Sequence, residues 1–98
     1  MNPQFELPPA FEIAMPDDAM APEIPAGRAL IFERTSTPPR PGTRILIADQ
    51  AGRRHVRRYA EGRDGAWRAL PDNRAHMDLD SAQDGLQLLA VLKWVGAE

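Results

Sequence analysis

Few side chains in this 98-residue sequence could act as a nucleophile paired with a general base. Cysteine is absent, which excludes thiolate catalysis, thiolate metal sites and disulfides. Ser36 and Ser81 both lie in turn-like sequence. No spacing pairs either serine with His55 or His76 as its base, so we expect all four residues to be structural.

Acidic side chains near the C-terminal third form a second candidate site. Asp78, Asp80 and Asp84 follow His76 closely. They lack the central glycine and closing glutamate of a calcium-binding loop. We therefore predict a solvated acidic loop, with no metal site and no cofactor.

Five arginines form a local basic cluster: Arg53, Arg54, Arg57, Arg58 and Arg63. Such a cluster could contact DNA phosphates or an acidic partner. The chain as a whole has a net charge of -2, which argues against a protein that coats nucleic acid. The simpler prediction pairs the arginines with nearby carboxylates, namely Asp17, Asp18, Asp49, Glu61 and Asp64.

The most informative motif lies between two apolar segments, within residues 13–32. Asp18-Ala19-Met20-Ala21-Pro22 resembles the Asp-Ser-Met-x-Pro motif of the LexA and phage-repressor self-cleaving family, except that Ala19 stands at the serine position. Further similar segments follow in the family's order: Pro41-Gly42 before residues 44–47, His55-Val56-Arg57-Arg58-Tyr59, Trp67 to Asn73, and Leu89 to Val95. The resemblance covers residues 11–95.

This resemblance implies a serine nucleophile activated by a lysine base, and both are missing here. The methyl group of Ala19 cannot attack a carbonyl, and Arg57 occupies the lysine position. A guanidinium stays protonated and cannot accept a proton. We predict that the site is vestigial, that Met15, Asp17, Asp18 and Met20 line its loop and cleft, and that Arg57 pairs with a carboxylate of that loop.

The elements that must position these residues are short strands. Ten prolines and seven glycines disfavour long helices. We predict strands over residues 11–14, 29–33, 44–49, 54–61, 66–70 and 86–95, with a helical turn over residues 20–24 and Asp17 or Asp18 to cap it. The predicted fold is all-β, with about seven short strands in small twisted, mostly antiparallel sheets, as in the LexA and signal-peptidase-like fold. Residues 1–10 form an extended arm, and residues 11–98 form the domain.

The last predicted strand carries the strongest interaction signal. Alternation places Leu88, Ala90, Leu92 and Trp94 on one face. An apolar face that no other part of the domain covers marks an interface. We therefore expect self-association through this face, and the alternative is that the face is buried in the domain's own core.

The function that the resemblance implies is non-catalytic: an oligomerisation and regulatory domain of a phage-type transcriptional repressor. It would form a homodimer or higher homo-oligomer, and it would contact DNA only through an N-terminal domain that this chain lacks. Only 18 residues precede Ala19, too few for the linker bond that the family cleaves. No apolar run approaches the roughly 20 residues that span a bilayer, and no signal peptide is evident, so we expect a cytoplasmic protein without a membrane partner.

Two alternatives remain open. One is a free-standing adaptor that binds a protein or peptide in the vestigial cleft through Met15 and Met20. The other is an active Ser/Lys self-cleaving peptidase, which requires that Ala19 be an engineered substitution.

Overall fold

The computed structural model describes residues 7–35 and 37–96, and it confirms the all-β prediction for them. The seven strands are β1 (Ala10–Ala14), β2 (Ala29–Arg34), β3 (Arg44–Ala48), β4 (Arg54–Glu61), β5 (Trp67–Leu70), β6 (Leu79–Asp80) and β7 (Gln87–Val95). The described residues include no helix long and apolar enough to cross a membrane.

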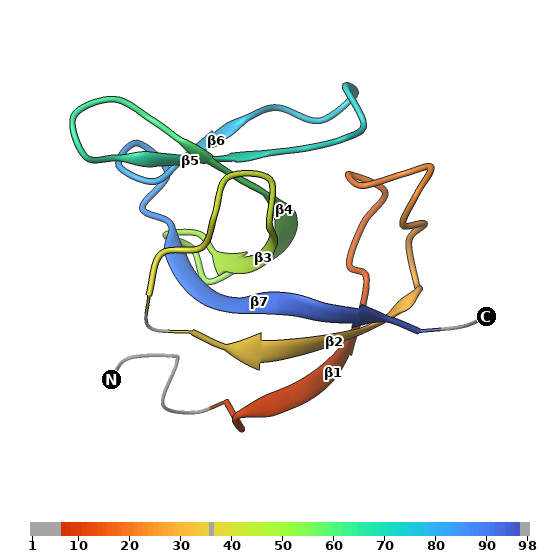
Figure 1. Ribbon diagram of the computed structural model, residues 1–98. Coiled ribbons are helices and arrows are strands. Elements are labelled where there is room, and N and C mark those ends of the chain that lie inside the picture. The colour runs from red at the N-terminus through yellow and green to blue at the C-terminus, as the bar shows by residue number, and fades with distance from the viewer. Residues whose placement is uncertain (1–6, 36, 97–98) are drawn as a thin grey trace.

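All seven strands join one antiparallel sheet in the order β1-β2-β7-β3-β4-β5-β6. The prediction of several small sheets is therefore wrong in this respect. The physical reason is the long β7, which pairs with β2 on one edge and β3 on the other. It thereby joins the N-terminal hairpin to the β3–β6 meander. Figure 1 shows β7 curving from the meander to lie along β2.

Apolar side chains pack in two clusters, because the central strands are apolar on both faces. The main cluster contains Met15, Met20, Ile24, Leu30, Phe32, Leu46, Ala48, Val56, Leu89 and Ala90. The second contains Ile45, Ile47 and Ala69, with Tyr59, Trp67, Leu79, Leu86, Leu88 and Val91 packed against it. β3 contributes to both clusters, so its run of buried residues is the centre of the domain.

Two register shifts in the pairing of β7 break its predicted alternation. One falls between Ile31 and Phe32 of β2, and the other between Leu46 and Ile47 of β3. A bulge of this kind turns the following side chains to the other face.

The four residues predicted to share a face of β7 consequently separate. Leu88 packs against the second cluster, whereas Ala90 and Leu92 belong to or pack on the main cluster. Trp94 is 67% exposed. The prediction of one continuous apolar face is wrong, and only Trp94 is left prominent at the surface.

Most predicted strand boundaries are confirmed to within one residue. The strand β6 was missed because it has only two residues and lies in irregular sequence. The predicted arm ends at Pro9, since β1 begins at Ala10, and Leu7 packs against the main cluster. Residues 1–6 of that arm lie outside the described residues. The predicted turn is confirmed by a hydrogen bond from the Ile24 N–H to the Met20 carbonyl.

Candidate functional site

The loop between β1 and β2 carries the motif and is anchored at its base. The Met15 N–H donates to the Arg28 carbonyl (2.8 Å), and the Gly27 N–H donates to the Met15 carbonyl (2.9 Å). Met15 and Met20 are almost completely buried in the main cluster. These two methionines were predicted to line a cleft. That prediction is wrong, because both side chains pack inside the main apolar cluster and leave almost no exposed surface. In this structure the two side chains are not accessible to an adaptor's ligand.

Asp17 organises the loop around Ala19, which stands at the serine position of the resembled motif. Its Oδ1 accepts the backbone N–H of Ala19 at 3.0 Å. Local carboxylate-to-backbone bonds of this type stabilise tight turns. Ala19 itself has no exposed surface, so its methyl group serves as packing.

Arg57 reaches the same carboxylate from β4. Its Nη2 lies 3.4 Å from Asp17 Oδ2, and its Nη1 donates to the Val56 carbonyl at 2.8 Å. The residue is only 4% exposed. The predicted ion pair between Arg57 and the loop is confirmed, and Asp17 is the partner. One carboxylate thus contacts both Ala19 and Arg57.

A second loop, after β5, closes over the motif through Asn73 and His76. The Asn73 N–H donates to the Ala19 carbonyl (2.8 Å), and its side-chain amide donates to the Asp18 carbonyl (3.1 Å). The His76 Nε2 lies 2.5 Å from Asp18 Oδ1. This contact lowers the pKa of Asp18 below its ordinary value.

Asn73 and His76 were missed as site residues by sequence reasoning. The similarity of residues 67–73 to a family segment indicated that this segment matters. It did not indicate that the segment contacts the Ala19 loop. Such contacts depend on how β5 and β6 fold back onto the sheet.

The remaining candidates have structural roles. Ser81 Oγ accepts the Trp67 N–H at 2.8 Å, and Asp84 Oδ2 accepts the Asp80 N–H at 2.8 Å. His55 lies 2.9 Å from Asp49, which lowers the pKa of that carboxyl group. No cluster of three metal-ligating side chains occurs in the described part of the chain. Ser36 lies outside the described residues.

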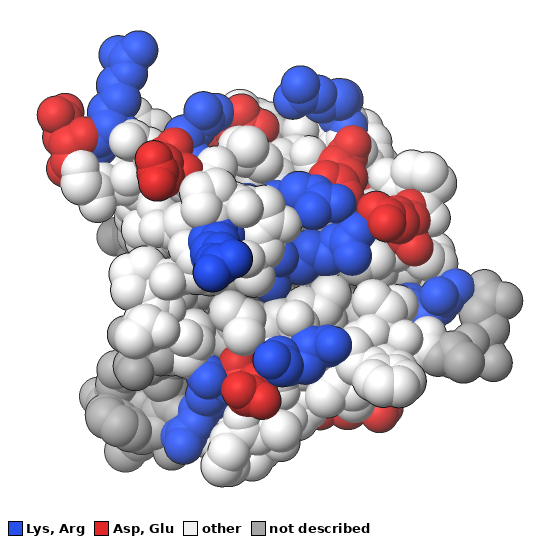
Figure 2. Space-filling view, in the orientation of Figure 1, with Lys and Arg blue, Asp and Glu red and all other residues white. Residues whose placement is uncertain are grey.

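Figure 2 shows basic and acidic side chains beside one another on one face of the molecule. Arg58 Nε donates to Asp72 Oδ1 at 2.7 Å, and this bond raises the pKa of Arg58. Arg58 also lies 3.5 Å from Glu23. Neither acid was among the predicted partners, since the sequence does not show which loops pack beside β4.

Comparison with curated proteins gives no match. A family model described as Peptidase S24-like matches residues 5–93, nearly the whole chain. The match spans β1 to β6 and most of β7, together with both loops around Ala19. The resemblance predicted from the motifs is confirmed at this level, and the chain belongs to the Peptidase S24-like family.

Proposed function

We propose that this domain is a non-catalytic member of its family. A Ser/Lys peptidase needs a hydroxyl to attack the peptide carbonyl and a neutral amine to take the hydroxyl proton. Ala19 has no hydroxyl, and Arg57 stays protonated. The single lysine of the sequence, Lys93, is exposed on β7 and lines a different pocket.

The observation that carries the proposal is the position of the Asp17 carboxylate. In acyl transfer, the backbone N–H of the nucleophile commonly stabilises the oxyanion of the tetrahedral intermediate. Here the N–H at position 19 is already bonded to Asp17, whose other oxygen faces Arg57. In this proposal Ala19 replaces the nucleophile and Arg57 replaces the base. The oxyanion donor, the N–H at position 19, is occupied by Asp17.

We propose a regulatory role in place of catalysis: the domain self-associates and serves a phage-type transcriptional repressor whose DNA-binding part is separate. Linking two DNA-binding parts raises their effective concentration on a two-fold operator without adding contacts. The exposed Trp94 supports an interface at the end of β7. The proposal includes a cytoplasmic location, where a bacterial repressor meets its operator.

Self-cleavage is the direct test of the catalytic part. The chain is extended at its N-terminus with a flexible Ala-Gly-containing linker and incubated at alkaline pH beside an Ala19→Ser variant. Neither protein should be cut, because the variant still lacks a base. A specific cut in the unchanged chain would overturn the proposal, and a cut in Ala19→Ser alone would show that Arg57 does not prevent catalysis.

A further inference from the structure

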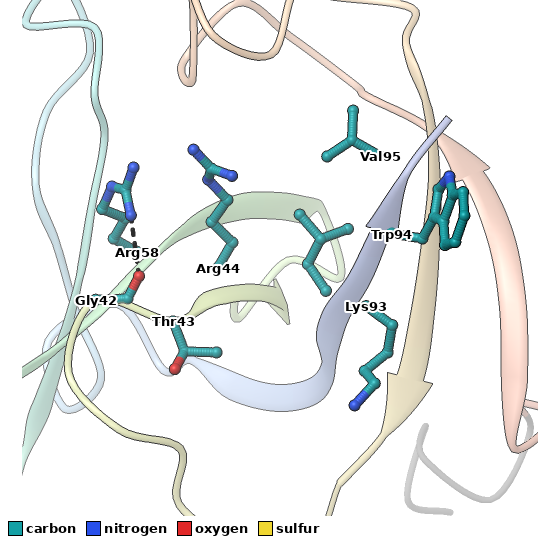
Figure 3. A pocket seen from close by; sticks show the side chains of 8 residues that line it. Gly42, Thr43, Arg44, Arg58, Lys93, Trp94 and Val95 are labelled. Atoms are coloured by element: carbon teal, nitrogen blue, oxygen red, sulfur yellow. Dashed lines mark hydrogen bonds between the residues drawn. The ribbon is translucent and has the colours of Figure 1, made fainter. Parts of the chain in front are cut away.

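A surface pocket of about 290 Å³ lies between the start of β3 and the end of β7. Its lining comprises Gly42, Thr43, Arg44, Arg58, Leu92, Lys93, Trp94 and Val95. Figure 3 shows Arg44 and Arg58 on one side with their guanidinium groups pointing the same way, and Val95 across from them. The indole of Trp94 points away from the arginines.

The pocket borders a strand edge that is only partly paired. β7 pairs with β2 as far as Val95, opposite Leu30. Its pairing with β3 ends at Val91, opposite Ile45. Within residues 7–35 and 37–96, no strand pairs with the β3-facing edge of residues 92–95. An unpaired edge is a template for an added strand.

Two cations in the pocket already hold a carboxylate. Glu23 Oε2 lies 2.5 Å from Arg44 Nη2 and 3.5 Å from Arg58 Nη2. The Glu23 side chain is 65% exposed, whereas that of Arg44 is 20% exposed. The buried Arg44 Nε has no hydrogen-bond partner among the described residues. The arginines are thus fixed, and the carboxylate is the exchangeable partner.

We propose that this pocket binds an extended acidic peptide of a partner protein. The peptide main chain pairs with the free edge of residues 92–95, and one of its carboxylates displaces Glu23 from Arg44 and Arg58. Leu92 and Val95 supply the apolar contact. This binding goes beyond the proposed regulatory function and does not depend on the loss of catalysis.

The strand edge favours a peptide over a nucleic acid as the occupant. A strand edge recognises main-chain amides, which a nucleic acid lacks. Paired arginines suit a carboxylate because the guanidinium forms two parallel hydrogen bonds with it. The chain is acidic overall, so this pocket is a local exception that favours a small acidic segment.

The test is titration of the isotopically labelled full chain with a short blocked peptide of alternating threonine and glutamate, followed by NMR. The backbone amide signals of residues 92–95 should shift. A peptide with glutamine in place of glutamate should bind roughly tenfold more weakly. No shift at millimolar peptide, or equal binding of both peptides, would overturn the proposal.

Variants with opposite expected effects separate binding from folding. Arg44→Gln should weaken binding roughly tenfold, whereas Glu23→Gln should strengthen it severalfold by removing the competing carboxylate. Arg63→Gln, a charge change on an exposed residue outside the pocket, should leave binding unchanged. Weaker binding by Glu23→Gln would contradict displacement. The titration is performed at one fixed protein concentration, because self-association through Trp94 would shift these amides as well.

Discussion

The carboxylate of Asp17 lies 3.4 Å from the guanidinium of Arg57, although the two residues are 40 positions apart in the sequence. Asp17 is 29% exposed in its side chain and Arg57 only 5%. A nearly buried guanidinium needs an acceptor to offset its lost hydration. The Ala19 loop supplies that acceptor, so this ion pair connects β4 to the loop between β1 and β2.

Replacing Arg57 by methionine should therefore destabilise the domain. Methionine fills similar space, but Asp17 loses its cationic partner and the Val56 carbonyl loses a donor. We expect a loss of about 2 kcal/mol in the free energy of unfolding, measured by urea denaturation. Arg63→Met, on an exposed turn, is the control and should change stability by less than about 0.5 kcal/mol. If Arg57→Met were as stable as the unchanged chain, the ion pair would have no stabilising role.

Self-cleavage should require three substitutions. Combining Ala19→Ser with Arg57→Lys supplies a hydroxyl and an amine, but Asp17 still occupies the N–H at position 19. A carboxylate beside that amine also favours its protonated form. We expect specific self-cleavage at alkaline pH only when Asp17→Gly is added, measured on the linker-extended protein by mass spectrometry. Equal cleavage without Asp17→Gly would show that the carboxylate does not block the site.

The contact between Asp18 and His76 should make stability depend on pH in the acidic range. His76 lowers the pKa of Asp18 in the folded state from its ordinary 3.8. A lowered folded-state pKa stabilises the protein above the unfolded-state value, and the stabilisation is lost as pH falls through the folded-state value. Asp18→Asn should thus be less stable than the unchanged chain at about pH 5, with the difference shrinking towards about pH 2.

Asp64→Asn is the matched control for this pH dependence. Asp64 is exposed in a turn with a φ of 56°, a conformation that asparagine tolerates. Its substitution should leave the difference in unfolding free energy nearly constant over the same range. A constant difference for Asp18→Asn as well would contradict the coupling to His76.

The sequence predicted the strands better than the site. Residues 54–61 were predicted with their observed boundaries, because turn residues bracket an alternating segment. The two-residue β6 has no such pattern. The register shifts of β7 also have no signature in the sequence. Because β7 is apolar on both faces, a shift of one residue does not change its pattern of apolar and polar residues.

The site was predicted in part, for a related reason. The motif located Ala19 and Arg57, and charge complementarity suggested the ion pair that joins Arg57 to the loop. Burial of Met20 and the contacts of Asn73 depend on the tertiary arrangement of two loops. Residue type and spacing carry no information about that arrangement.

Self-association through the end of β7 should depend on Trp94. The other apolar residues predicted with it are at least partly buried, so its indole provides the exposed apolar surface there. Large aromatic side chains contribute strongly to interfaces. Trp94→Ser should weaken association by about tenfold or more, measured by analytical ultracentrifugation over a range of concentrations. Met77→Ser removes a second large exposed apolar side chain, which is 82% exposed, and should leave association unchanged. If the unchanged chain were a monomer at every concentration, or if both variants weakened association equally, Trp94 would have no specific role in an interface. The proposed dimeric regulatory domain would then lose its present support.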